Sequence, residues 1–116
     1  MNQETAMKCV IEEAPSSTLV RIEGAISDDY LGEIRGVFET ALAKKLPIIV
    51  DIAEVSFISS SGLGLLFNTD SRLKVEGKKL IIASPSEEVR HLFVVTRIEN
   101  HVLICNSVSD ALSHIR

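Results

Sequence analysis

Short runs of apolar residues alternate along the chain with longer segments in which apolar residues recur every three or four positions. The short runs are rich in Val, Ile and Leu, which is typical of buried strands. Gly24 is expected to end the second run, because glycine punctuates regular structure. The predicted strands are Lys8 to Glu12, Thr18 to Glu23, the run that opens at Ile48, Leu80 to Ala83, and Val102 to Cys105.

The longer segments predict four amphipathic helices. The first is expected from about Asp28 to Lys44, and the second from the serines at positions 59–61 to about Glu76. Ser84-Pro85-Ser86-Glu87 predicts a third helix with Ser84 as its cap and proline at the first helical position. Ser107 is expected to cap the last helix. The residues expected on the buried side of the second helix are Leu63, Leu66, Phe67 and Leu73.

Strands that alternate with helices indicate parallel strands joined by right-handed crossovers. The first two strands follow each other without a helix and therefore predict an antiparallel pair at one edge. We expect one α/β domain over residues 1–116, with a mixed, mostly parallel sheet and about four helices mainly on one face. Because each crossover is short, the parallel strands are expected to lie in sequential order.

Composition and charge narrow the possible partners. The 116 residues carry a net charge of −4 and contain no cluster of Lys and Arg, which argues against a nucleic-acid partner. No apolar run approaches the roughly 20 residues that a membrane-spanning helix needs, and the first residues lack a signal-peptide pattern, so a cytoplasmic protein is expected.

Cysteines and histidines show no ligand spacing, and no metal or cofactor is expected. Cys9 and Cys105 are predicted to be reduced, buried packing residues. The histidines, predicted to lie on the surface, are His91, His101 and His114.

The stretch from Ile48 to Gly64 carries the candidate chemistry. A buried strand is followed by Ser59-Ser60-Ser61, by Gly62 and Gly64, and then by a helix. The serines can simply cap the helix, whose first N–H groups are unpaired and carry partial positive charge. A hydrolase nucleophile elbow needs glycine two residues before the serine, and a Walker phosphate loop needs a lysine after the second glycine. Both are absent, so the remaining chemical interpretation is a serine presented as a phosphoryl acceptor.

The same stretch resembles the signature of the STAS domain family, which includes the bacterial anti-anti-sigma factors, also called anti-sigma-factor antagonists. The similarity rests on Val50-Asp51 followed by the run from Val55 to Gly64, and it extends over nearly the whole chain. Gly77 to Leu80, Ser84 to Val89 and Asn106 to Leu112 also look like the family.

The resemblance implies a binding switch that is not itself an enzyme. The serine before the glycine, here Ser61, would be phosphorylated by an anti-sigma factor that is a serine kinase, with Ser60 and Ser59 as alternative acceptors. The unphosphorylated form would bind the anti-sigma factor and free the sigma factor, and a metal-dependent serine/threonine phosphatase would restore it. The expected partner-binding residues are Ser27, Asp28, Asp29, Tyr30, Ser59, Ser60, Ser61, Gly62, Leu63 and Gly64.

Two positions differ from the family's usual pattern, which has aspartate where this chain has Ser27 and Ser59. Serine can cap a helix at both places, but it removes negative charge from the expected partner surface. The alternative function is a STAS scaffold or ligand-binding subunit of a stress-signalling or lipid-transport complex.

Overall fold

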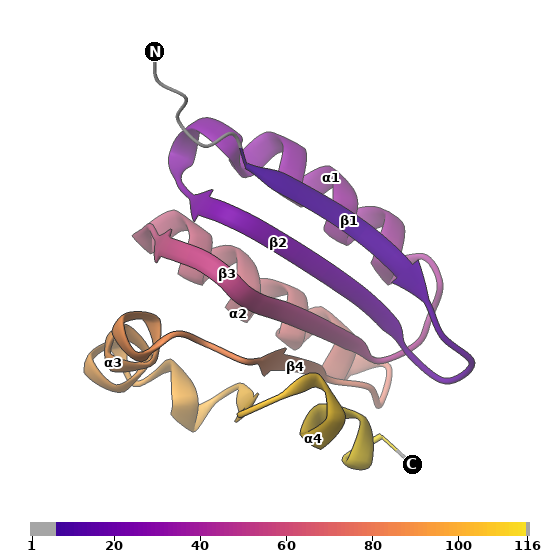
Figure 1. Ribbon diagram of the computed structural model, residues 1–116. Helices are drawn as coiled ribbons and strands as arrows, with labels where there is room; N and C mark the ends of the chain where they lie inside the picture. Colours follow the sequence, from indigo (N-terminus) through magenta and orange to yellow (C-terminus); the bar gives the residue numbers. More distant parts are fainter. Residues whose placement is uncertain (1–6, 116) are drawn as a thin grey trace.

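A five-stranded sheet runs through the middle of the molecule in the computed structural model, which describes residues 7–115 (Figure 1). The strands are β1 (Lys8–Glu13), β2 (Thr18–Ile26), β3 (Ile48–Ile58), β4 (Leu80–Ala83) and β5 (Leu103–Cys105). They lie in the order β1-β2-β3-β4-β5; β1 is antiparallel to β2 and every other pair is parallel. The predicted mixed sheet, its antiparallel edge strand and its sequential order are confirmed.

Strand β2 extends beyond its predicted end, and the run that opens at Ile48 forms one strand, β3. Gly24 does not end β2: it lies inside the strand at a φ of 99°, where the register with β3 shifts. Strand β3 is continuous from Ile48 to Ile58, although Ala53 and Glu54 are exposed. An irregular ladder of this kind bends a strand and allows an extra residue without ending the pairing.

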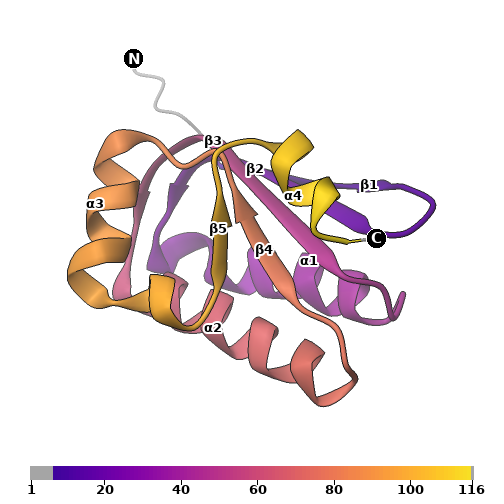
Figure 2. The ribbon, with the colours of Figure 1, turned by 90° about the horizontal axis from the view of Figure 1, so that it is seen from below.

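Four α-helices flank the sheet: α1 (Leu31–Leu42), α2 (Ser60–Val75), α3 (Glu87–Thr96) and α4 (Val108–Ser113). A 3₁₀ turn, Asp28–Tyr30, leads into α1, and another, Ile98–Asn100, follows α3. Figure 2 shows α4 on the opposite side of the sheet from α1 and α2. The expected excess of helices on one face is confirmed.

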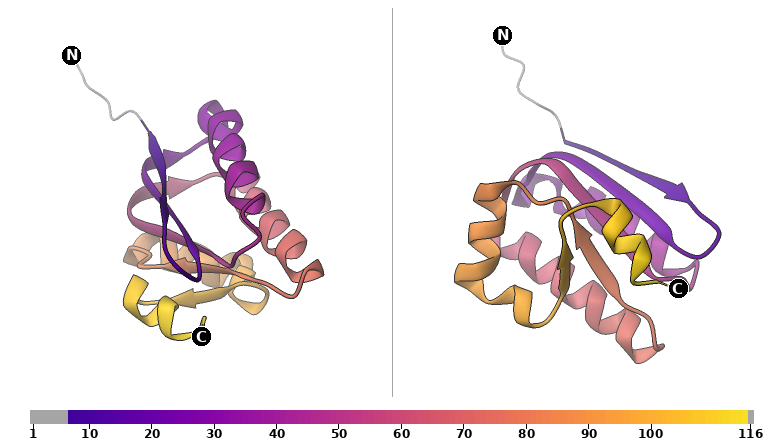
Figure 3. Two further views of the ribbon diagram at one scale, coloured as in Figure 1. Left: turned by 90° about the vertical axis from the view of Figure 1, so that its right-hand side faces the viewer. Right: turned by 60° about the horizontal axis from the view of Figure 1, so that its bottom comes forward.

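Two apolar cores reflect this arrangement. The larger core joins alternate residues of β2, β3 and β4 to the inner sides of α1, α2 and α3, and α1 and α2 lie side by side over it (Figure 3). The smaller core packs Ile49, Ile81 and Ala83 against Ala111 of α4. Every residue of β4 is buried because both of its faces are covered, which explains its unbroken apolar sequence.

Two details of the helices correct the sequence interpretation. The cap of α3 is Ser86, whose Oγ accepts from the Val89 N–H at 3.2 Å, whereas Ser84 lies in the preceding loop at a φ of 65°. In α2 the buried side includes Leu65, Leu66 and Leu73, but Phe67 is 42% exposed. Gly77 follows α2 at a φ of 74°, the left-handed conformation in which glycine commonly ends a helix.

Cysteine burial leads to a prediction about alkaline stability. Cys105 is buried, but Cys9 is only half-buried, because β1 is an edge strand; both are free thiols. Burial, with a smaller contribution from the negative charge of Glu33, raises the pKa of Cys9 from 9.0 to about 11. Between these values the unfolded chain loses the thiol proton and the folded chain keeps it, so stability falls as pH rises.

Urea denaturation at pH 7.5 and pH 10 measures this effect. The wild-type protein is expected to lose up to about 1 kcal/mol more free energy of unfolding over this interval than the Cys9→Ala variant, because solvent screens part of the effect at this half-buried thiol. The Cys105 thiol is present in both proteins, so its contribution cancels. Equal losses in the two proteins would show that the Cys9 thiol titrates normally.

Candidate functional site

The carboxyl ends of β2 and β3 bring the two predicted partner-binding segments to one edge of the sheet. Ile26 and Ile58, the last residues of these strands, pair with each other. The Ser59 N–H then donates to the Ile26 carbonyl oxygen at 2.8 Å, which ties the β3–α2 turn to the end of β2. Residues 27–30 and 59–64 therefore start from adjacent points, where open α/β sheets usually place their binding sites.

Ser59 is the cap of α2. Its backbone is extended, and its Oγ accepts from the Gly62 N–H at 3.0 Å. Ser60 and Ser61 are the first two helical residues, and both are exposed. The Ser59 hydroxyl is therefore engaged in the capping bond, whereas Ser60 and Ser61 face solvent at the partly positive end of the helix.

Gly62 fills a gap that no larger residue fits. A Cβ atom there would lie 2.7 Å from Ile26 Cγ2 and 3.0 Å from Ile58 Cγ2. Both isoleucines are buried, at 1% and 2% exposure, so neither methyl group has room to move away. Gly64 differs, because a Cβ atom there would meet nothing within 4 Å. Because Gly62 has no side chain, the serine turn can pack closely against the ends of both strands.

Alanine substitutions at Gly62 and Gly64 test whether close packing, and not only helix propensity, matters at Gly62. Gly62→Ala is expected to lower the free energy of unfolding by roughly 1–3 kcal/mol, because the added methyl group overpacks a closed site. Gly64→Ala is the matched control and is expected to raise stability by up to about 1 kcal/mol through helix propensity. Urea denaturation of both variants measures the difference. A Gly62→Ala protein as stable as the Gly64→Ala protein would contradict this packing.

The first segment adds acidic side chains. Ser27 precedes the 3₁₀ turn, but its hydroxyl makes no capping bond, contrary to the prediction; its carbonyl oxygen accepts from the Tyr30 N–H at 3.0 Å. Asp28 and Asp29 are exposed in this turn, whereas Tyr30 is half-buried against the larger core, as is Leu63 of α2. The exposed polar groups at this site are therefore the carboxylates of residues 27–30 and the serine hydroxyls of residues 59–64.

An apolar groove that the sequence did not predict borders the serine turn. It measures about 420 Å³ and lies between the end of β3 and α3. Phe57 is 53% exposed in its wall, because Ile58 takes the core-facing position beside it. The residues that line the groove are Ser56, Phe57, Ile58, Glu88, Val89, His91, Leu92 and Val95.

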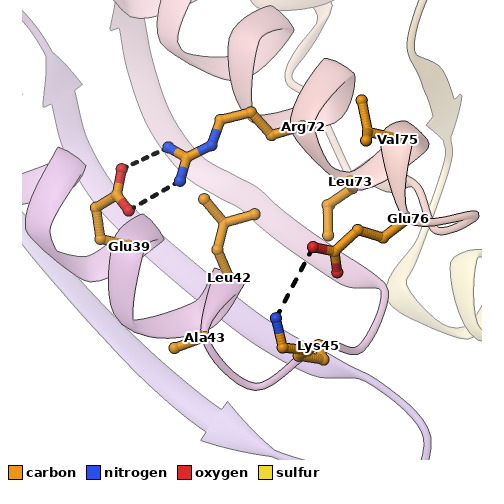
Figure 4. Close-up of a pocket in the computed structure, with 8 residues that line it drawn as sticks. All are labelled: Glu39, Leu42, Ala43, Lys45, Arg72, Leu73, Val75 and Glu76. Carbon is orange, nitrogen blue, oxygen red and sulfur yellow. Dashed lines mark hydrogen bonds and ion pairs between the residues drawn. The ribbon is translucent and has the colours of Figure 1, made fainter.

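A second hollow, of about 390 Å³, lies between the carboxyl ends of α1 and α2 (Figure 4). Arg72 spans it with two hydrogen bonds to Glu39, at 2.5 and 3.1 Å, and lowers the pKa of that carboxyl group. Lys45 and Glu76 approach within 3.8 Å. This hollow is at the opposite end of α2 from Ser61, and its facing charges already pair with one another.

The remaining expectations concern metals, membranes and histidines. Residues 7–115 contain no group of three His, Cys, Asp or Glu side chains placed to hold a metal ion. Within the same residues no helix combines the length and apolarity that crossing a membrane requires. The three histidines are exposed, as predicted.

Comparison with known proteins gives one family and a consistent set of folds. The model of the STAS domain matches residues 8–111. An anti-sigma factor antagonist from Mycobacterium paratuberculosis has a similar structure, with a TM-score of 0.88, 20% identity, and coverage of 96% of this chain and 95% of that one. A putative anti-sigma factor antagonist from Thermotoga maritima gives a TM-score of 0.85 at 20% identity, with coverage of 93% and 94%.

The anti-sigma factor antagonist SpoIIAA in its unphosphorylated form also matches, with a TM-score of 0.74 and 21% identity over 94% of this chain and 98% of that one. The phosphorylated form of SpoIIAA, a Bacillus cell fate determinant, gives a TM-score of 0.71 at 21% identity, with coverage of 94% and 100%. At this identity the comparisons establish a shared fold.

Proposed function

The chain belongs to the STAS domain family, and on that basis we propose that it is an anti-sigma-factor antagonist controlled by phosphorylation of Ser61. The unmodified protein binds an anti-sigma factor that is also a serine kinase, and the sigma factor is thereby freed for transcription. Phosphate on Ser61 ends this binding, and a metal-dependent serine/threonine phosphatase restores it. The chain is a substrate and a binding protein in the cytoplasm, with no catalysis of its own.

The exposure of Ser61 at the start of α2 is the observation that carries this proposal. A kinase needs an accessible hydroxyl, and Ser61 is exposed while the Ser59 hydroxyl is bound to the Gly62 N–H. Ser60 is exposed as well and is the competing acceptor. The structures of SpoIIAA in phosphorylated and unphosphorylated forms support the same kind of switch, because that protein shares this fold.

Asp28 and Asp29 supply the charge of the proposed partner surface. Both are exposed in the turn that follows β2, next to the turn that carries Ser61. They provide negative charge near the positions where the family usually has aspartate and this chain has Ser27 and Ser59. A partner with basic side chains would be complementary to them.

Affinity capture from the native cell tests this function. The Ser61→Ala protein is expected to retain a serine kinase that also binds a sigma factor. Asp28→Lys and Asp29→Lys should each reduce recovery of that kinase several-fold. Glu99→Lys is the matched control, because Glu99 is exposed but precedes β5 and so lies at the opposite edge of the sheet.

The identity of the retained proteins decides between the functions. Capture of a transport or scaffold complex in place of a kinase would contradict the anti-sigma-factor role. Equal recovery with all three lysine variants would place the interface elsewhere on the domain.

A further inference from the structure

Strand β1 leaves one of its sides open. It pairs with β2 alone, and no other strand of residues 7–115 lies beyond it (Figure 3). Its pairing with β2 is regular over six residues, from Lys8 opposite Glu23 to Glu13 opposite Thr18, without a register shift. No proline or bulge interrupts it. A straight, regular edge of this kind is a template for another strand.

The side chains of β1 alternate between two environments. Cys9 and Ile11 are half-buried and pack at the margin of the larger core. Lys8, Val10 and Glu12 are exposed on the other face, and Val10 is 48% exposed. The apolar residue in the middle thus lies between a cation and an anion.

We propose that β1 binds β1 of a second copy of this chain, antiparallel, around a two-fold axis at Val10. Lys8 then lies opposite Glu12 of the second copy, Cys9 opposite Ile11, and Val10 opposite itself. Because α1 packs on β1 from the core side, the two copies of α1 would meet across the same axis. The result is a sheet that continues from one copy to the other, with the proposed partner-binding segments, residues 27–30 and 59–64, present on each copy.

Charge complementarity selects both the occupant and the register. Within the part of the chain that the structure describes, Lys8 forms no ion pair, whereas Glu12 is bound by Arg21 Nη1 at 2.5 Å. The two-fold at Val10 gives Lys8 an acidic partner twice per dimer, and opposite charges stabilise cross-strand pairs.

Other registers are less favourable. A shift of one residue sets Lys8 against Ile11 in one direction; in the other it sets Lys8 against Glu13 but places the half-buried Cys9 against Glu12. Either shift turns the helices of the second copy to the other face. A shift of two residues sets a charged side chain against Val10. An edge contact of six residues is smaller than a standard interface, so a weak dimer is expected.

Cysteine cross-linking of the full chain tests the axis. Residues directly opposite in an antiparallel pair have Cα atoms about 4.5–5.5 Å apart, within disulfide range. Val10→Cys is expected to give a disulfide-linked dimer on mild oxidation. Lys8→Cys and Glu12→Cys should each remain monomeric alone and cross-link when mixed. The wild type is the control, since its own Cys9 would face Ile11.

Charge reversal gives an independent readout by sedimentation at protein concentrations up to about 1 mM. Lys8→Glu alone and Glu12→Lys alone should each weaken dimerisation roughly tenfold, because like charges then face each other. An equimolar mixture should restore it to within about threefold of the wild type. Circular dichroism verifies that each variant is folded.

The proposal is overturned if Val10→Cys cross-links no better than Glu12→Cys, or if the wild type stays monomeric over this concentration range. It is also overturned if the edge binds only a strand from a different protein. None of these results would affect the role proposed for Ser61.

Discussion

Ser61→Asp is expected to weaken binding of the proposed partner, an anti-sigma factor, by two to three orders of magnitude and to leave the fold intact. Ser61 is exposed in the first turn of α2, next to the exposed Asp28–Asp29 turn. A partner packed on this surface would meet added bulk and a charged group that is costly to desolvate. A loss of roughly 3–4 kcal/mol corresponds to this change in the dissociation constant.

The fold is expected to tolerate the carboxylate of Ser61→Asp because this charge lies at the start of a helix. The first N–H groups of a helix and its dipole favour a negative group, so the Ser61→Asp protein should melt at or slightly above the wild-type temperature. The Ser59 cap bond to Gly62 does not involve Ser61 and remains in place. Isothermal titration with the captured kinase and thermal melting measure the two effects separately.

Ser109→Asp is the matched control for Ser61→Asp. Ser109 is exposed and is the second residue of α4 after the Ser107 cap, as Ser61 is the second residue of α2 after Ser59. Helix α4 lies on the other face of the sheet. The control should bind normally, and Ser61→Ala should bind constitutively. Loss of the fold in Ser61→Asp, or wild-type affinity in that variant, would contradict the mechanism.

Asp70→Ala is expected to have the largest effect on stability, a loss of about 2–4 kcal/mol. Asp70 is 2% exposed on the inner side of α2. Its Oδ1 accepts from the N–H of Leu80, the first residue of β4, at 3.0 Å, and its Oδ2 lies 2.9 Å from Lys74 Nζ. The alanine variant leaves the buried Leu80 N–H unpaired and leaves space that the carboxyl group had filled. Lys74 loses its ion pair but keeps the hydrogen bond from its Nζ to the His101 carbonyl oxygen.

Asp70→Asn separates the contribution of the hydrogen bond to Leu80 from that of the ion pair with Lys74. The amide keeps an oxygen for the Leu80 N–H and loses only the charge, so its loss should be clearly smaller than that of alanine. Urea denaturation of both variants gives the comparison. Equal losses would show that the ion pair with Lys74, and not the bond to Leu80, provides the stabilisation.

The sequence was sufficient for the features that follow from local pattern. Alternating apolar runs and amphipathic segments predict parallel strands in sequential order, which places the ends of β2 and β3 side by side. The serines after an apolar strand predict a helix start, and Ser59 does cap α2. The sequence pattern is therefore sufficient to expect that residues 27–30 lie beside residues 59–64.

Features that depend on tertiary contacts could not be predicted. Phe57 and Phe67 look like core residues in sequence but are exposed, while Asp70 looks like a surface residue and is buried. Gly62 and Gly64 are indistinguishable in sequence, and only the approach of Ile26 makes one of them essential for packing. The burial or packing of each of these residues depends on which distant segment of the chain contacts it in the folded protein.

Phosphorylation of the purified protein by the captured kinase tests the proposed switch most directly. The unmodified chain is incubated with that kinase and ATP, the modified residue is located by mass spectrometry of residues 59–61, and the affinity of the phosphorylated chain is measured. One phosphate on Ser61, with binding weakened at least a hundredfold and an unchanged circular dichroism spectrum, is the predicted result. Phosphate on another residue, or a phosphorylated Ser61 that binds the kinase as tightly as before, would contradict it.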